Sequence, residues 1–176
     1  MYPVLQYLLV LVFPALVAVG GLRDLTSYII PNWISLAIVG AFLPAALAAG
    51  VSPQEMALSA GVGAAGLVAG MIMFALGWIG GGDAKLFAAA SLWIGWPACL
   101  PYLAYTGIAG GALAMGLLGL RSAMVKPFLP VSPRWFGRLT EPGESVPYGV
   151  AIAVGALAAF PNSTLGHAAA ASWFSF

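Results

Sequence analysis

The stretch PVLQYLLVLVFPALVAVG, residues 3–20, contains 18 residues and no charged side chain. An α-helix needs about 20 predominantly apolar residues to cross the hydrocarbon core of a bilayer, so this stretch has close to the length of a membrane-spanning helix. Pro14 lies inside it, which membrane helices tolerate because neighbouring helices satisfy the carbonyl groups that a proline leaves free. The stretch therefore predicts a first transmembrane helix.

The composition extends this prediction to the whole chain. Of the 176 residues, 62% are hydrophobic and only 6% are charged, and the mean hydropathy is +1.01. Soluble domains carry about 25% charged residues, and disordered chains have low hydrophobicity. Both classes are excluded, and the chain is predicted to be an all-α, polytopic membrane protein.

Five further apolar stretches follow, separated by Pro, Gly and Trp residues that mark helix ends and the membrane–water interface. We expect a bundle of about six transmembrane helices that forms one integral-membrane domain over residues 1–176, without a separate soluble domain. Asn32 is expected to cap the second span. The expected spans are Pro3–Gly20, Trp33–Ala49, Met56–Trp78, Ala84–Trp96, Ala98–Leu120 and Tyr148–Phe160.

The basic residues orient this arrangement. All six fall on one face of the predicted bundle, which the positive-inside rule assigns to the cytoplasm. Both termini are then expected outside, and the lack of Lys or Arg ahead of the first span favours an uncleaved first helix over a signal peptide. The six are Arg23, Lys85, Arg121, Lys126, Arg134 and Arg138.

Two of the five acidic residues lie where a predicted helix meets the cytoplasmic surface. Asp24 follows the first span, and Asp83 follows a run of three glycines and opens the fourth. The chain crosses the bilayer twice between them, so both carboxyl groups are expected at the same membrane surface. Glu55, Glu141 and Glu144 are expected to be solvated loop charges.

Two neighbouring carboxyl groups suit acid–base chemistry, because one keeps a proton at a pH where the other has lost it. The charged group can take a proton from water while the neutral one polarises a peptide carbonyl. Two structural interpretations compete with this one. They are an interfacial cluster of Arg23 with Asp24, and a role for Asp83 as a helix N-cap balanced by Lys85.

Other functional classes find little support. The net charge of +1 argues against a nucleic-acid partner. Cys99 and His167 are the only residues of their types, so a cysteine framework, a CxxC zinc site and an HExxH zinc site are excluded. No metal and no cofactor are therefore expected.

Two motifs carry a resemblance to a known family. Arg23-Asp24-Leu25 followed by Ile30-Pro31-Asn32 resembles the first aspartate motif of the type IV prepilin peptidases. Gly80-Gly81-Gly82-Asp83 resembles their second, the GxGD motif, which presenilin-type proteases share. Order, spacing and expected placement agree with that family over essentially the whole chain.

The resemblance implies a function for the matched positions. Asp24 and Asp83 would be the catalytic dyad of an aspartic endopeptidase, with Gly80 and Gly82 shaping the loop through which substrate approaches. The partner would be a prepilin, whose short basic leader is removed ahead of its apolar helix at the cytoplasmic face of a prokaryotic inner membrane. Arg23 and Lys85 would tune the dyad or contact lipid phosphate.

The chain is similar to the minimal form of the family. The large bifunctional enzymes carry an insertion with paired CxxC motifs and also N-methylate the new terminus; here that insertion is absent, so methyltransferase activity is not expected. This arrangement of spans without an insertion resembles that of the peptidases of tight-adherence (Flp-type) pilus systems. Archaeal preflagellin peptidases have a similar arrangement. The oligomeric state stays open.

Two other functions remain as alternatives. A presenilin-like protease would cut within the bilayer, but that class usually places its first aspartate inside a helix, whereas Asp24 is expected after the first span. A small proton-coupled transporter would favour acids near the midplane and internal repeats, and neither is found. The basic and aromatic loop Arg121–Pro147 is expected to lie along the lipid surface, or to dock the leader through Glu141 or Glu144.

Overall fold

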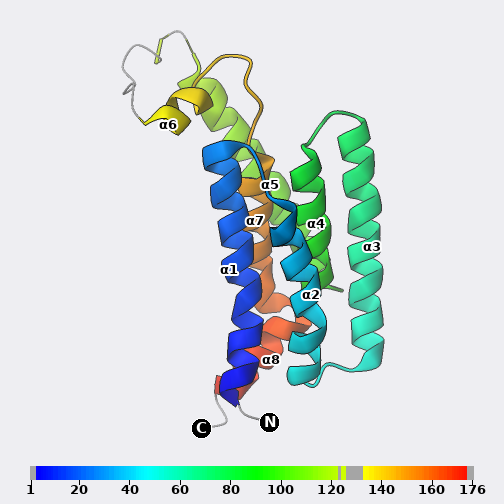
Figure 1. The fold of residues 1–176 in the computed structure, drawn as a ribbon. Coiled ribbons are helices and arrows are strands. Elements are labelled where there is room, and N and C mark those ends of the chain that lie inside the picture. Colours follow the sequence, from blue (N-terminus) through cyan, green and yellow to red (C-terminus); the bar gives the residue numbers. More distant parts are fainter. Residues whose placement is uncertain (1–2, 123, 126–132, 174–176) are drawn as a thin grey trace.

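The computed structural model describes residues 3–122, 124–125 and 133–173. All the secondary structure in this part of the chain is helical, as expected from the composition (Figure 1). In chain order the elements are α1 (Pro3–Ser27), α2 (Asn32–Ala48), α3 (Pro53–Ala75), α4 (Gly81–Ile94), α5 (Cys99–Leu120), α6 (Arg134–Leu139), α7 (Tyr148–Ala159), η2 (Phe160–Asn162) and α8 (Thr164–Trp173).

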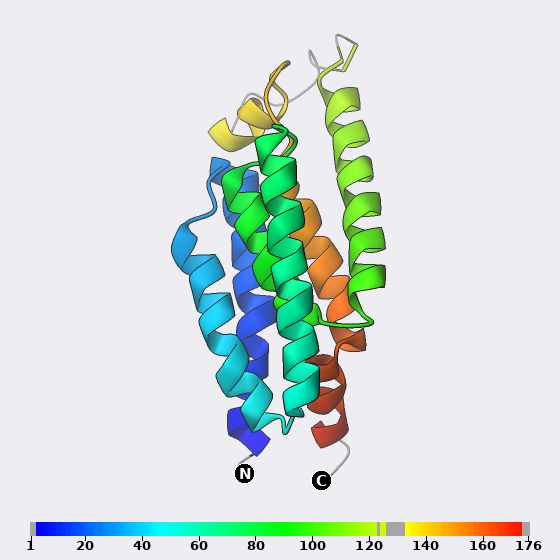
Figure 2. The same cartoon turned by 90° about the vertical axis from the view of Figure 1, so that its right-hand side faces the viewer.

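The long helices run roughly along one another in a bundle (Figures 1 and 2). Helices α1, α2, α4 and α7 meet around a buried core, in which Phe13 stacks on Trp93 with ring centroids 5.0 Å apart. The indole Nε1 of Trp93 donates a hydrogen bond of 2.7 Å to the carbonyl of Ile38. Helix α3 packs on α4 from one side, and α5 packs on α7 from the other.

Among the described residues, three helices are long and apolar enough to cross a membrane: Val4–Ser27, Pro53–Ala75 and Cys99–Leu120. The pair Tyr148–Asn162 and Thr164–Ala170 passes the same criterion together, with a bend of 57° between its parts. Helix α2 is apolar but has 17 residues, and α4 has 14. The described helices thus have the lengths and the apolar composition of a helical membrane protein. The number of about six spans and the placement of both termini outside stay predictions.

The first helix is longer than expected, and this moves Asp24. Helix α1 continues past Gly20 to Ser27, because residues 21–27 contain no proline and Gly21 packs against Ala153 of α7. It ends at Tyr28, whose φ of 57° is the left-handed conformation that commonly stops a helix. Asp24 therefore lies inside a helix, not after it.

Two expectations about helix starts are corrected as well. Pro31, not Asn32, occupies the N-cap position of α2, and the Asn32 side chain instead accepts a hydrogen bond of 2.8 Å from Lys85. Glu55 is exposed as expected, but it is not a loop charge. It closes a capping box with Ser52 at the start of α3, a pattern that Ser52-Pro53-Gln54-Glu55 already displays.

Small residues set the spacing between α3 and α4. A Cβ placed at Gly66 would lie 2.6 Å from Oγ of Ser91, and one at Gly70 would lie 3.0 Å from the carbonyl oxygen of Ala84. These two glycines therefore let the backbones of α3 and α4 approach closely, as their GxxxG spacing predicts. The equivalent pair on α5, Gly107 and Gly111, does not, because a Cβ at either position would meet nothing within 4 Å.

Candidate active site

The structure brings the two aspartates together at one end of the bundle. Asp24 comes from the end of α1 and Asp83 from the start of α4, and their exposed fractions are only 4% and 7%. Both line a cavity of about 170 Å³, here called the smaller aspartate cavity. Both also line a second cavity of about 420 Å³, the larger aspartate cavity. The two carboxyl groups thus face shared spaces.

Asp83 is held by the glycine run that precedes it. Gly80 occupies the N-cap position of α4, and its amide donates a hydrogen bond of 3.1 Å to Oδ2 of Asp83. A Cβ at Gly82 would lie 3.1 Å from Cβ of Ile30, so the small residue lets the start of α4 approach the segment before α2. Asp83 is the third residue of α4, and its side chain caps the helix by accepting the hydrogen bond from the N-cap amide. The same side chain lines both aspartate cavities.

Asp24 is held by a residue far along the chain. The amide of Gly149, in the first turn of α7, donates a hydrogen bond of 2.7 Å to Oδ2 of Asp24. A Cβ at Gly149 would lie 2.8 Å from Cβ of Asp24 and 2.7 Å from Cδ1 of Ile30, so only glycine fits this approach. The positive end of the α7 dipole also favours a carboxylate here.

The carboxyl groups also act on each other. Asp83 interacts electrostatically with Asp24, and the Gly149 amide that binds Asp24 interacts with the Asp83 carboxyl group as well. Two buried acids that interact in this way favour a state in which they share one proton. The arrangement can therefore supply one general base and one general acid.

The two basic residues next to the aspartates point elsewhere. Arg23 is exposed, and Lys85 is exposed and bound to Asn32. Neither is among the residues that line the aspartate cavities. The structure thus shows no direct contact between the Lys85 amine and Asp83, and the tuning role of the two cations stays a prediction.

Tyr28 is a site residue that the sequence did not single out. It lines both aspartate cavities, and its buried hydroxyl has no hydrogen-bond partner among the described residues. Burial raises the pKa of this hydroxyl, opposed by the charge of Arg121. The guanidinium carbon of Arg138 lies 4.7 Å from the centroid of the Tyr28 ring. A lone tyrosine after a helix offers no signal for such a position.

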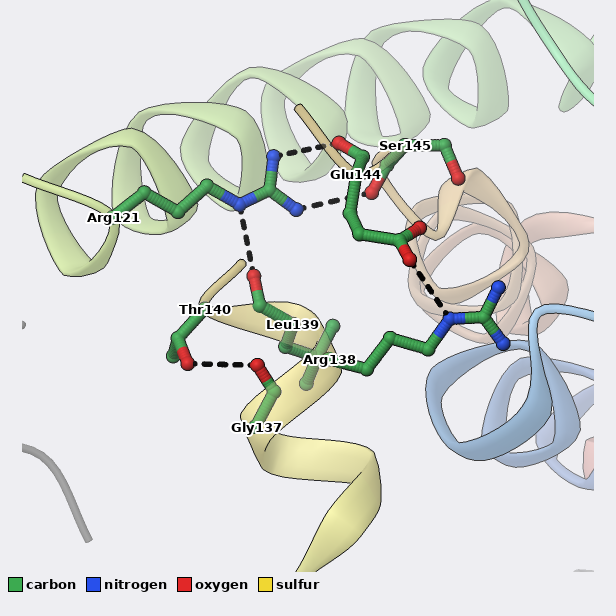
Figure 3. Close-up of polar contacts among 7 residues, drawn as sticks. All are labelled: Arg121, Gly137, Arg138, Leu139, Thr140, Glu144 and Ser145. Carbon is green, nitrogen blue, oxygen red and sulfur yellow. Dashed lines mark hydrogen bonds and ion pairs between the residues drawn. The ribbon is translucent and has the colours of Figure 1, made fainter. Parts of the chain in front are cut away.

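Arg121 fastens the segment that leads to Gly149 (Figure 3). Its guanidinium donates to the carbonyl oxygens of Leu139 at 2.8 Å, Glu144 at 2.8 Å and Ser145 at 3.1 Å. Arg138 adds an ion pair of 3.1 Å with the carboxylate of Glu144. We call these contacts the Arg121 clamp. Ser145 lines the larger aspartate cavity, so the clamp fixes one of its walls.

The clamp changes two expectations about the loop Arg121–Pro147. Arg121 is a structural residue as well as a cation of the predicted inner face, and Glu144 is half-buried and paired with Arg138. Glu141 is exposed, as expected. Lys126 and Phe128, which contribute to the expected lipid-facing pattern, lie outside the described residues.

The position of Asp24 inside α1 removes one distinction from presenilin-like proteases, which was based on an aspartate placed after the helix. The comparison with known protein families supplies a different distinction from presenilin-like proteases. The sequence model that describes the type IV leader peptidase family matches residues 11–115 of this chain. The matched segment includes both aspartates and the glycine run. The searches of curated proteins and of solved structures found no match.

The matched segment covers more than half of the chain and contains the two motifs on which the resemblance rested, so that prediction is confirmed. It ends before the Arg121 clamp and α7, which the geometry alone connects to the site. The chain belongs to the type IV leader peptidase family, the prepilin peptidases, and is accordingly a membrane protease.

Proposed function

We propose that the protein is an aspartic endopeptidase that removes the basic leader of Flp-type prepilins, with Asp24 and Asp83 as its catalytic residues. The observation that carries this proposal is the burial of both carboxyl groups in the walls of the same two cavities. Isolated buried acids are costly, and acids kept together at such a cost are candidates for function.

The reaction needs no covalent intermediate. The ionised carboxylate takes a proton from a water molecule, whose oxygen attacks the carbonyl carbon of the scissile peptide bond. The protonated carboxyl group donates its proton toward the carbonyl oxygen and so stabilises the charge that develops there. Collapse of the tetrahedral intermediate breaks the C–N bond, and the proton taken from water passes to the leaving amine.

The backbone around the dyad suits this reaction. The amides of Gly149 and Gly80 each donate to Oδ2 of one carboxyl group and so hold the two acids in place. Gly80, Gly81 and Gly82 line the smaller aspartate cavity without side chains of their own. An extended peptide can therefore approach Asp83 closely along this stretch.

The same end of the bundle carries several of the basic residues. Arg23 lies near the end of α1, Lys85 near the start of α4 and Arg121 just after α5 (Figure 1). By the positive-inside rule this end faces the cytoplasm. We therefore place the dyad at the cytoplasmic side of the inner membrane, in one integral-membrane domain with about six spans and both termini outside.

A presenilin-like activity, cleavage within the bilayer, is the second candidate. It is favoured by the position of Asp24 inside α1. The two activities differ in where the substrate is cut, so mapping the new amino terminus of the product distinguishes them: it lies ahead of the apolar helix for a leader peptidase and inside that helix for an intramembrane protease.

The experiment that tests the proposal is co-expression of the protein with an Flp-type prepilin. Asp24→Asn and Asp83→Asn should each abolish leader removal while the variant still inserts into the membrane at the wild-type level. Each substitution keeps the size of the side chain and removes its ability to exchange a proton. Cleavage that persists in either variant would contradict the two-aspartate mechanism.

A further inference from the structure

An apolar groove runs along the side of α5 that faces α3. It has a volume of about 360 Å³. Met73 of α3 lines one wall, Gly107 and Gly111 of α5 line the other, and Phe87 of α4 and Ile152 of α7 lie between them. Figure 2 shows α5 standing apart from α3, with α7 visible between the two helices. We call this space the α5 groove.

The α5 groove adjoins the site. Ile79 and Tyr148 line both the groove and the larger aspartate cavity, so these two residues form a wall that the two spaces share. A larger groove of about 560 Å³ lies between α2, α3 and α4, but it has no lining residue in common with either aspartate cavity. A still larger space of about 770 Å³ along α3 shares no lining residue with the aspartate cavities either. Volume therefore does not single out the α5 groove, whereas its nearness to the dyad does.

The glycines of α5 leave room for another helix. A Cβ at Gly107 or Gly111 would meet nothing within 4 Å, whereas the equivalent glycines of α3 are filled by α4. Small residues four positions apart let the backbones of two membrane helices approach closely, and close packing drives such association in lipid. This face of α5 therefore offers a packing surface that no described helix of the chain uses.

The chemistry changes along the path. Apolar side chains and glycines dominate the α5 groove, while Asp24, Tyr28, Asp83 and Ser145 line the larger aspartate cavity. A segment that fits the whole path is an apolar helix joined to an extended, polar and basic segment. The helix would lie in the groove at membrane depth, and the polar segment would pass the two acids.

We propose that the α5 groove holds the apolar helix of the prepilin substrate, packed against Gly107 and Gly111, and delivers the peptide bond ahead of that helix to the dyad. This inference rests on the proposed function, because it takes the two aspartates as the groups that cut. The groove then explains how the enzyme selects a site next to a membrane helix.

Filling the groove tests the proposal. In proteoliposomes, Gly107→Leu and Gly111→Leu should raise KM for a full-length Flp-type prepilin at least about tenfold, the factor that accompanies loss of about 1.4 kcal/mol of binding. A soluble peptide that covers the leader junction without the apolar helix should keep kcat/KM within about twofold, since the dyad is untouched. Wild-type KM for the prepilin in Gly111→Leu would overturn the proposal, and so would equal losses on both substrates.

Gly116→Leu is the matched control. Gly116 lies on the same helix, a Cβ there also meets nothing within 4 Å, and it is not among the residues that line the groove. Leucine at this position should leave both substrates unaffected. A rise in KM as large as that of Gly111→Leu would mean that any bulky residue on α5 disturbs the enzyme, and the groove would lose its special role.

A binding measurement separates this proposal from the dyad mechanism. A photo-crosslinking amino acid at position 111, in an Asp83→Asn background that does not consume substrate, should form an adduct with the apolar helix of the prepilin, and one at position 116 should not. Adducts only with lipid or with a second copy of the chain would overturn the groove. If the prepilin adduct forms but Asp83→Asn still cleaves, the groove stands and the dyad mechanism fails.

Discussion

The two buried aspartates are held in opposite ways. Asp83 accepts its hydrogen bond from Gly80, three residues earlier in the same helix start. Asp24 accepts its bond from Gly149, 125 residues further along the chain. We call Asp83 and its glycine run the local half of the site, although the Gly149 amide also interacts with the Asp83 carboxyl group. We call Asp24 with Gly149 the long-range half, because its hydrogen bond exists only when α7 packs against α1.

The packing of α7 on α1 depends on small residues. A Cβ at Gly21 would lie 2.8 Å from Cβ of Ala153, so the two helices approach as closely as their side chains allow. The Arg121 clamp then fixes the segment from which α7 starts. The hydrogen bond to Asp24 depends on both of these supports, whereas the bond from Gly80 to Asp83 forms within one helix start, and this difference can be tested.

The largest effects should come from the aspartates themselves, and here the two halves should behave alike. Asp24→Asn and Asp83→Asn should each lower kcat by roughly 10²–10⁴-fold, the range of acid–base catalysis. The double variant should be no slower than the slower single variant, because the pair acts as a unit. Single-turnover cleavage of a prepilin measures this, and losses that multiply in the double variant would mean independent roles.

The glycines that hold the two aspartates should separate the halves. Gly149→Ala should lower activity about a hundredfold, since its Cβ would displace Asp24 and a shift of about 1 Å costs that much. Gly80→Ala should cost less than about tenfold, because its Cβ would meet only the end of the Asp83 side chain, with Oδ2 at 3.1 Å, and a small rotation of that side chain relieves the contact. Equal losses in the two variants, measured as kcat/KM, would remove the distinction.

Arg121 should matter for the long-range half. Arg121→Lys should lower kcat by about tenfold and leave KM nearly unchanged, because one ammonium group cannot donate to three carbonyl oxygens in fixed directions. Exposed Arg23→Lys is the matched control and should retain wild-type kcat. A fully active Arg121→Lys would show that charge alone suffices at this position.

Tyr28 should have a small effect that appears at high pH. Its folded-state pKa is raised above the usual 10.0 by burial, so the neutral hydroxyl stabilises the fold below that pH and this stability is lost as the pH rises through the folded pKa. Tyr28→Phe should cleave normally near pH 7 and lose less Tm than the wild type between pH 9 and pH 11. An identical fall of Tm in both proteins would contradict this assignment.

Chelators should have no effect on either half of the site. The sequence offers no cluster of metal ligands, and the proposed reaction uses the carboxyl groups alone. Cleavage by membranes treated with EDTA should match that by untreated membranes. Inhibition that one metal ion reverses would contradict a metal-free mechanism.

The sequence predicted the local half of the site well. The glycine run, the helix that begins beside Asp83 and the helical class all follow from residues close together in the chain. The number of apolar stretches between Asp24 and Asp83 predicted that they lie on the same side, and the structure brings them to one end of the bundle. Hydropathy and helix length, which are properties of single segments, are enough for this prediction.

The contacts of the long-range half could not be predicted from hydropathy and helix length. Val146-Pro147-Tyr148-Gly149 shows nothing in its composition that connects it with Asp24, and the clamp residue Arg121 looks like any cation near a membrane. The first span was expected to end at Gly20, whereas α1 continues to Ser27, with Gly21 packed against Ala153 of α7. Contacts between distant helices decide these features.

The measurement that tests the central claim most directly is a cross-link between the two aspartate positions. In a Cys99→Ala background, the pair Asp24→Cys and Asp83→Cys should be joined in membranes by a short thiol-specific bifunctional reagent. The pair Arg23→Cys and Asp83→Cys should not, because Arg23 is exposed beside the buried Asp24. Failure of the first pair to join, with both cysteines reactive, would contradict a shared site; efficient joining in the first pair alone is the result we predict.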